Sequence, residues 1–138
     1  MNPLQILLAE DNLGDILLVK DALASHEIPH DLHVVRDGDE ALAFIEHMGG
    51  PDRIRCPDVM LLDLNLPKVD GAEILSKFRQ HPLCGETPVI VITSSDALRD
   101  RERIAKFGIA RYFRKPSDLN EFLKLGAVVL EVVGGKPE

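Results

Sequence analysis

Five short apolar runs, each followed by a stretch with helical spacing, constrain the fold of this chain more than any other feature. The runs occupy residues 6–9, 32–35, 59–62, 89–92 and 111–114. Nearly continuous apolar runs of this length are typical of strands that are buried on both faces, as in parallel sheets. The alternation with helices predicts an α/β protein with a doubly wound, parallel, five-stranded sheet and helices on both faces.

The first and last helices carry apolar residues at helical spacing. In the first helix, the inward face is expected to hold Leu13, Ile16, Leu17 and Leu23, with Lys20 along its edge. Asp96 and Asp118 are expected to be the N-cap residues of the last two helices. Residues 119–133 are expected to form one continuous fifth helix. Its inward face is expected to hold Leu119, Phe122, Leu123, Val129, Leu130 and Val133.

The outer side of this fifth helix predicts a contact with a second copy of the chain. Leu125, Val128 and Val132 fall nearly opposite the inward face on a helical wheel. A second apolar stripe facing water commonly marks an interface, and two-fold homodimers dominate soluble assemblies. The alternative is a very hydrophobic terminal helix that is covered by the tail at 134–138.

Length and composition place limits on the class of protein. The 138 residues, 45% of them hydrophobic, fit one full-sized core, and residues 1–138 are expected to form a single domain. The net charge of -7 argues against binding to nucleic acid or to an anionic membrane surface. No apolar stretch approaches the ~20 residues of a membrane span. With no signal peptide in view, we expect a cytoplasmic protein in which Cys56 and Cys84 are free thiols.

Polar side chains follow four of the predicted strands at the point where each strand ends. Glu10 and Asp11 follow the first run, Asp63 the third, Thr93 the fourth and Lys115 the fifth. In a parallel sheet these strand ends meet along one edge, where open α/β folds bind their ligands. Taken singly, each has an ordinary explanation, such as a solvated turn, a helix cap or an exposed lysine. Their joint placement predicts a functional site.

The chemistry of this set favours phosphoryl transfer with a metal ion. Three crowded carboxylates repel one another unless a cation is bound, and Mg²⁺ prefers oxygen ligands. Asp63 is the candidate nucleophile. Thr93 and Lys115 are candidate donors to the phosphoryl oxygens.

With these motifs the chain resembles the receiver domain of two-component response regulators along essentially its full length. The motifs that carry the resemblance are Glu10-Asp11, Leu-Leu-Asp63-Leu-Asn-Leu-Pro, Asp70-Gly71, Thr93 and Lys115-Pro116. The resemblance implies a flavodoxin-like (βα)5 fold. It also implies a stand-alone regulator, because the residues after Lys115 suffice for one helix and a tail but not for an output domain.

The resemblance further implies how the site works. Asp63 takes a phosphoryl group from the phosphohistidine of a sensor histidine kinase. Mg²⁺ is held by Asp11 and Asp63, by Glu10 through water, and by the backbone carbonyl of Asn65. Such a domain catalyses only its own phosphorylation and slow dephosphorylation, so it is not a turnover enzyme.

Two further features carry the family pattern. Tyr112, three residues before Lys115, matches the aromatic switch position that responds together with Thr93. The long loop before Asp63 and the run Thr93-Ser94-Ser95-Asp96 are similar to small regulators that are paired with phytochrome histidine kinases.

Two other functions stay open at this point. A phosphohydrolase with an aspartyl-phosphate intermediate uses similar residues, but it usually has a second Asp where this chain has Asn65. A flavin- or nucleotide-binding module needs a Gly-rich phosphate loop after the first strand. Here that place holds Glu10 and Asp11, which repel phosphate in the absence of metal.

Overall fold

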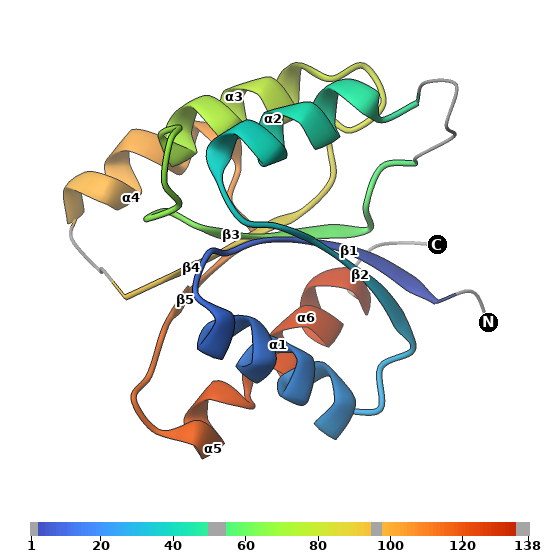
Figure 1. Cartoon of the computed structure of the whole chain (residues 1–138), viewed down its shortest axis with the longest axis vertical. Helices are drawn as coiled ribbons and strands as arrows, with labels where there is room; N and C mark the ends of the chain where they lie inside the picture. Colours follow the sequence, from blue (N-terminus) through green and yellow to red (C-terminus); the bar gives the residue numbers. More distant parts are fainter. Residues whose placement is uncertain (1–2, 50–54, 95–97, 135–138) are drawn as a thin grey trace.

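The computed structural model describes residues 3–49, 55–94 and 98–134, in which strands and helices alternate along the chain (Figure 1). The strands are β1 (Leu4–Ala9), β2 (His30–Val35), β3 (Val59–Asp63), β4 (Val89–Thr93) and β5 (Arg111–Arg114). The helices are α1 (Leu13–Ser25), α2 (Gly38–His47), α3 (Gly71–Gln80), α4 (Leu98–Ile104), α5 (Leu119–Phe122) and α6 (Leu125–Gly134), with a 3₁₀ turn at Ala105–Phe107. Within the described ranges, no helix is both long and apolar enough to cross a membrane.

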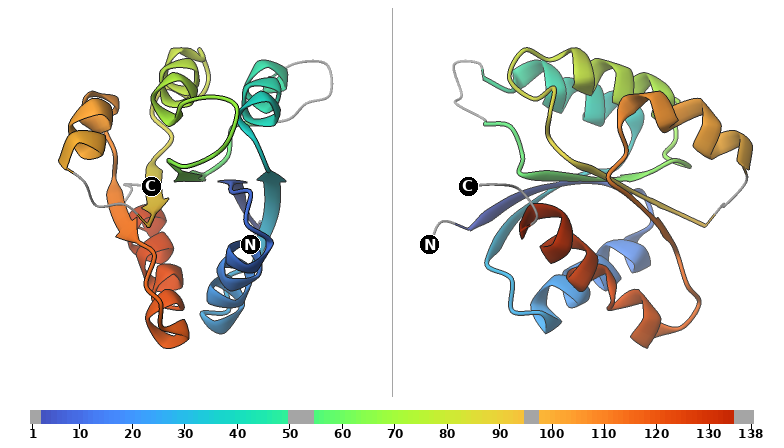
Figure 2. Two further views of the ribbon diagram at one scale, coloured as in Figure 1. Left: turned by 60° about the vertical axis from the view of Figure 1, so that its left-hand side comes forward. Right: turned by 180° about the vertical axis from the view of Figure 1, so that it is seen from behind.

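The five strands form one parallel sheet in the order β2-β1-β3-β4-β5. Helices α2, α3 and α4 cover one face, and α1, α5 and α6 cover the other, as the side views in Figure 2 show. The predicted doubly wound, flavodoxin-like fold is therefore confirmed. In this order β1, β3 and β4 lie in the interior of the sheet, and every residue of β3 and β4 is buried.

Two cores fill the space between the sheet and its helices. On β1, Leu7 and Ala9 point toward the α2–α4 layer, whereas Ile6 and Leu8 point toward the layer of α1, α5 and α6. This alternation follows from the strand geometry, which sends successive side chains to opposite faces. Because both faces of the interior strands are covered, β3 and β4 have no solvated side, and their polar residues lie at the carboxyl ends. The edge strand β2, in contrast, exposes Asp31 and His33.

Helix caps fix the helices that surround the sheet edge. The Asn12 side chain accepts a hydrogen bond from the Asp15 N–H at 2.9 Å, which starts α1 directly after β1. Asp118 caps α5 in the same way, as predicted. The prediction of a cap at Asp96 falls outside the described residues.

The inward face of α1 differs from the predicted one. Ile16, Val19 and Leu23 are buried, but Leu13 and Leu17 are 62% and 60% exposed. The prediction was wrong for these two leucines because the stripe through Ile16, Val19 and Leu23 faces the sheet. This orientation turns Leu13 and Leu17 onto an outer flank of the helix.

The expected fifth helix is broken into α5 and α6. The Lys124 N–H bonds to the Glu121 carbonyl and the Gly126 N–H to the Leu123 carbonyl, both three residues back and at 3.2 Å. These tighter turns rotate α6 relative to a continuous helix. Leu125 is consequently fully buried, so its assignment to an exposed stripe was wrong.

The other residues of the predicted inward face differ in their burial. Phe122 and Val129 are buried, whereas Leu119 and Leu130 are 53% and 45% exposed. Val128 and Val132 are half-buried, and they pack on the core that α1, α5 and α6 cover. The two valines form one flank of α6 rather than a fully exposed stripe.

The prediction of free cysteines is also wrong. Cys56 and Cys84 form a disulfide, with their Cα atoms 5.6 Å apart and a sequence separation of 28. Cys56 precedes β3 and Cys84 precedes β4, and these strands are neighbours in the sheet. The sheet order brings the two segments together, and that proximity is invisible in the sequence.

A glycine at the crossing of α1 and α6 gives a direct test of this packing. A Cβ atom on Gly126 would lie 2.3 Å from His26 Nδ1 and 2.6 Å from the Ala22 carbonyl oxygen. Gly126→Ala is therefore expected to lower the free energy of unfolding by about 1–3 kcal/mol, because the helices must separate. The matched control is Gly134→Ala in the same helix, where a Cβ would meet nothing within 4 Å. Urea unfolding that is equal for the two variants would contradict the described contact between α1 and α6.

Candidate functional site

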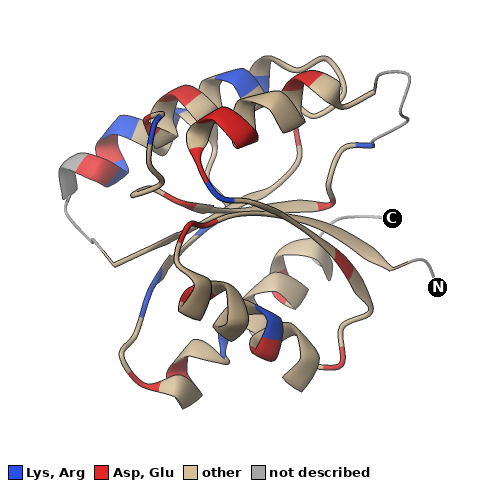
Figure 3. Cartoon of the chain, in the orientation of Figure 1, with Lys and Arg blue, Asp and Glu red and all other residues tan. Residues whose placement is uncertain are grey.

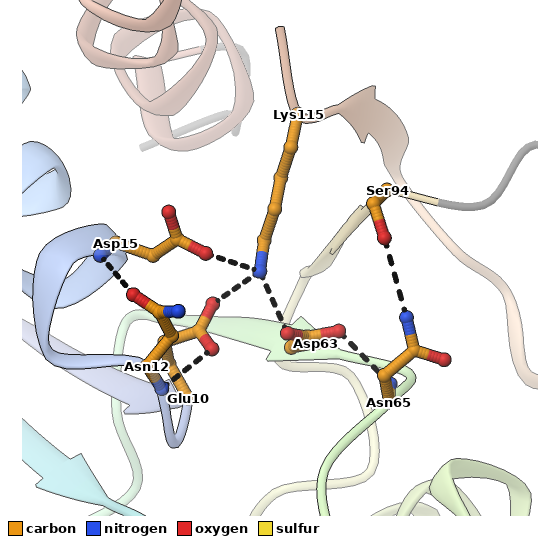
Figure 4. Close-up of polar contacts among 7 residues, drawn as sticks. All are labelled: Glu10, Asn12, Asp15, Asp63, Asn65, Ser94 and Lys115. Carbon is orange, nitrogen blue, oxygen red and sulfur yellow. Dashed lines mark hydrogen bonds and ion pairs between the residues drawn. The ribbon is translucent and has the colours of Figure 1, made fainter. Parts of the chain in front are cut away.

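The Lys115 ammonium group lies at the centre of a cluster of carboxylates (Figure 4). Its Nζ is 2.7 Å from Glu10 Oε1, 2.7 Å from Asp63 Oδ2 and 2.8 Å from Asp15 Oδ2. The side chains of Lys115, Glu10 and Asp63 are 14%, 2% and 5% exposed. Removing one partner from ion pairs this buried would leave an uncompensated charge, so the cluster ties together the segments at the ends of β5, β1 and β3 and the first turn of α1.

The parallel sheet places these residues together. Asp63 is the last residue of β3 and Thr93 is the last of β4, while Glu10 and Lys115 directly follow β1 and β5. The Lys115 N–H donates to the Thr93 carbonyl at 2.8 Å, so the main chain also joins the ends of β4 and β5. The structure thus brings Glu10, Asp63, Thr93 and Lys115 to the carboxyl edge of the sheet.

Asp63 uses both of its oxygens in this arrangement. Oδ2 pairs with Lys115, and Oδ1 accepts a hydrogen bond from the Asn65 N–H at 2.9 Å. The Asn65 side chain donates from Nδ2 to Ser94 Oγ at 3.5 Å, which links the loop after β3 to the end of β4 (Figure 4). The role of the Asn65 backbone carbonyl as a metal ligand stays a prediction.

Three carboxylates at this edge fit a divalent cation. One oxygen from each of Glu10, Asp11 and Asp63 lies within 4.8 Å of the other two. All three donors are hard oxygens, which suit Mg²⁺ or Mn²⁺. Asp11 is exposed, whereas Glu10 and Asp63 are buried. One side of the carboxylate group is therefore open to solvent, where water can complete the coordination shell of a metal ion. Lys115 alone does not balance Glu10, Asp15 and Asp63, and a divalent ion bound at this edge would supply the missing positive charge.

Burial changes the titration of this cluster. Burial raises the pKa of Glu10 to about 7, and the hydrogen bond from Lys115 only partly offsets that effect. Burial alone would lower the pKa of Lys115. The hydrogen bonds to Asp15, Asp63 and Glu10 outweigh it and raise that pKa above its ordinary value. Lys115 therefore stays charged near neutral pH.

Thr93 and Tyr112 lie on adjacent strands next to the cluster. Thr93 is buried, and Tyr112 is half-buried and packs against the core under α2, α3 and α4. Tyr112 pairs with Val91, which lies two residues before Thr93 on β4. The side chains of Tyr112 and Thr93 are therefore diagonal neighbours on the same face of the sheet. The Arg101 guanidinium carbon lies 4.7 Å from the centroid of the Tyr112 ring, which links β5 to α4 by a cation–π contact.

Sequence reasoning missed several contributors. Asp15 was not expected to bind Lys115; the signal was its place four residues after Asp11, in the first turn of a helix that starts at the site. Arg103 on α4 pairs with Asp70, the N-cap residue of α3. This pair borders a cavity of about 230 Å³ next to the loop after Asp63, and Asn65 also lines it.

Known proteins with similar sequence or structure point to one family. The profile of the "Response regulator receiver domain" family matches residues 6–126. The response regulator Rcp1 of Synechocystis sp. is 37% identical over 123 residues, which cover 89% of this chain and 84% of that protein.

Two crystal structures show the same likeness. Phosphorylated RcpA, a cyanobacterial phytochrome response regulator, has a TM-score of 0.86 and 33% identity, covering 99% of this chain and 98% of that one. The Mn²⁺-bound form of Rcp1 has a TM-score of 0.81 and 35% identity, covering 94% and 93%.

The pKa of Glu10 makes a prediction for the metal-free protein. The ordinary pKa of a glutamic acid is 4.5, and the pKa of Glu10 in the folded chain is about 7. Between these two pH values, folded Glu10 keeps a proton that the unfolded chain has released. Stability in a chelator should therefore fall as the pH rises through this window, by on the order of 3 kcal/mol from this group. Glu10→Gln should remove this part of the slope in urea titrations at several pH values. The control Asp39→Asn, at an acid whose side chain is 71% exposed, should leave it in place. A wild-type slope in Glu10→Gln would refute the assignment.

Proposed function

This chain belongs to the response regulator receiver domains, and we propose that it accepts a phosphoryl group from a sensor histidine kinase onto Asp63. The observation that carries the proposal is the buried Asp63 carboxylate at a strand end, 2.7 Å from Lys115 and beside Glu10 and Asp11. A carboxylate nucleophile, a fixed cation and a group of metal-ligating oxygens are the parts that phosphoryl transfer needs.

Each residue has a role in the proposed transfer. A carboxylate oxygen of Asp63 attacks the phosphorus, and the bond from phosphorus to the donor histidine nitrogen breaks. Lys115 then exchanges its contact with Asp63 for one with a phosphoryl oxygen, while Glu10 and Asp15 keep it in place. The Thr93 hydroxyl donates to another phosphoryl oxygen. Asp11 and Asp63, Glu10 through water and the Asn65 carbonyl would hold Mg²⁺, which would supply positive charge next to the transferring group.

The donor has to approach from the side of α1. Leu13 and Leu17 are exposed one turn apart on the first half of this helix, directly after the loop that carries Glu10 and Asp11. Exposed leucines beside a charged site are suited to dock a protein that delivers a phosphohistidine. The likeness to RcpA supports a phytochrome as that kinase.

We place the protein in the cytoplasm, where sensor kinases present their phosphohistidine. We also propose that residues 1–138 act without an output domain. The high coverage of both Rcp1 and RcpA supports this proposal. The signal then leaves through a changed surface or a changed assembly.

A surface for such a change lies along β5 and α6. β5 is an edge strand, and Arg111 Nη1 binds Glu131 Oε2 at 2.8 Å, which ties α6 to it. Val128 and Val132 lie half-buried on one flank of α6. The neighbouring α4 carries alternating positive and negative residues, as Figure 3 shows, which suits complementary pairing between two copies. We propose that a second copy of the chain packs on this surface.

Phosphorylation and this surface are linked through Thr93 and Tyr112 in our proposal. A phosphoryl group on Asp63 draws the Thr93 hydroxyl inward and leaves room for Tyr112 to rotate, because Tyr112 lies diagonally next to Thr93 on the same face of the sheet. Rotation breaks the contact with Arg101 and so moves α4. The result is a two-state element that local charge biases.

The first test concerns the acceptor. Acetyl phosphate with Mg²⁺ should phosphorylate the wild type, and Asp63→Asn should abolish this, because an amide is no nucleophile. Chelation of Mg²⁺ should also abolish it. Phosphate-affinity gels and intact mass measure the outcome, with Asp39→Asn as a control that should label normally. Acid-labile phosphate on Asp63→Asn would exclude Asp63 as the sole acceptor.

The second test concerns assembly. The wild type should shift from monomer toward dimer in sedimentation when it is phosphorylated, and Val132→Lys should weaken the dimer by tenfold or more, about 1.4 kcal/mol. Leu130→Lys, on the other flank of α6, is the matched control and should dimerise like the wild type. Thr93→Ala should accept phosphate without the shift. A wild type that stays monomeric in both states, or equal dimerisation of the two lysine variants, would exclude this interface.

A further inference from the structure

The disulfide lies at the end of the sheet opposite to the carboxylate cluster. Cys56 lies in the segment that leads into the amino end of β3, and Cys84 lies in the turn between α3 and β4. Asp63 and Thr93 are the last residues of the same two strands, at their carboxyl ends. Figure 1 shows the course of β3 and β4 between the two ends of the sheet. The bridge is therefore separate from the phosphorylation site, although the closed loop of residues 56–84 contains Asp63.

The two sulfur atoms differ in their surroundings. Cys84 is fully buried, and its Sγ lies 3.7 Å from Met48 Sδ. Cys56 is half-buried and follows Arg55, whose side chain is 59% exposed and pairs with Asp58 at 3.2 Å. An incoming thiolate can reach Cys56, and the positive charge of Arg55 favours its approach. Cys84 is then the sulfur that leaves.

His81 gives the leaving sulfur a polar neighbour. One of its ring nitrogens lies within 4.8 Å of both sulfur atoms. The Leu83 N–H donates to Nδ1 at 3.1 Å, and Nε2 lies 3.0 Å from the Met48 carbonyl oxygen, so the ring is held in place. Cys84 belongs to the buried apolar core, so this fixed ring is a polar group beside the sulfur that leaves.

The cellular setting favours a bridge that opens and closes. Our proposed function places this chain in the cytoplasm, where thiols are kept reduced and disulfides are usually transient or redox-sensing. On this point alone the inference rests on the proposed function. A bridge with one accessible and one buried sulfur has the asymmetry that stepwise exchange requires.

We propose that Cys56–Cys84 is a reversible thiol–disulfide exchange site that reacts with a dithiol reductant. A thiolate of the reductant attacks Cys56 Sγ, the bond to Cys84 breaks, and the Cys84 thiolate takes a proton from water. The second thiolate of the reductant then attacks the mixed disulfide and releases Cys56. The reductant is oxidised by two electrons, and the bridge is reduced to two thiols. A small disulfide such as oxidised glutathione drives the reverse reaction.

The redox state should set the stability of the segment that contains Asp63. Opening the bridge removes a constraint across residues 56–84, so the reduced protein should unfold about 10 °C lower. Thr87 Oγ1 still donates to the Pro57 carbonyl at 3.3 Å, and the β3–β4 pairing does not depend on the bridge. The fold and the acceptor site should therefore persist in the reduced state.

The test uses the full chain under native conditions. After treatment with oxidised glutathione, maleimide labelling should find no free thiol, and dithiothreitol should return two. In single variants exposed to oxidised glutathione, Cys84→Ser should form a mixed disulfide at Cys56 at least about tenfold faster than Cys56→Ser forms one at Cys84. Equal rates, free thiols in the oxidised protein, or reduction only after unfolding would overturn the proposal. So would reduced cysteines that are blocked by a bound zinc or copper ion.

Two controls separate this inference from the proposed function. Asp63→Asn should keep the full thiol–disulfide behaviour although it accepts no phosphate. Cys56→Ser combined with Cys84→Ser should accept phosphate from acetyl phosphate and lose only the redox-dependent change in unfolding temperature. A redox-dependent unfolding temperature in this double variant would contradict the assignment to the bridge.

Discussion

The ion cluster around Lys115 is the interaction on which the site depends. One ammonium group is shared by Glu10, Asp15 and Asp63, each within 2.8 Å. Leaving any of these charges without its partner at such burial would cost several kcal/mol. The free-energy cost of burying these charges is offset because the fold places each acid next to Lys115. Glu10 and Asp63 lie at strand ends, and Asp15 lies in the first turn of α1. The cluster holds the Asp63 carboxylate in place, and in the proposed function a divalent metal ion would offset the remaining negative charge.

The parallel sheet explains why the chemistry lies at one edge. Strands β1, β3 and β4 are covered on both faces, so their interiors accept only apolar side chains. Polar groups are admitted where the strands stop, and parallel strands stop together. The same burial raises the pKa of Glu10 to about 7 even beside Lys115, so a further positive charge such as a divalent ion would be needed to favour its charged form fully near neutral pH. Metal binding and site charge are thus coupled by the architecture.

Particular elements show how far sequence reasoning reached. The strands, their order along the chain, the edge residues and the Asp118 cap were predicted from apolar runs and from the residues at their ends. The inward face of α1 was predicted wrongly for Leu13 and Leu17, because a helical wheel gives several plausible stripes and only contact with the sheet selects one. The prediction of a single fifth helix was wrong because the N–H groups of Lys124 and Gly126 bond to carbonyls three residues back. These tighter turns rotate α6 and bury Leu125.

The sequence by itself determined the class of fold and the place of the carboxylate cluster at the carboxyl edge of the sheet. Periodicity is local, and the carboxyl ends of parallel strands meet whatever the details of packing. Contacts between segments that are distant along the chain were decided only by the tertiary structure. They include the Cys56–Cys84 bridge, the Asp15–Lys115 pair and the packing of Arg101 on Tyr112. The physical reason is that such contacts depend on strand order and helix rotation, which arise from the summed packing of the whole core and leave no local pattern in the sequence.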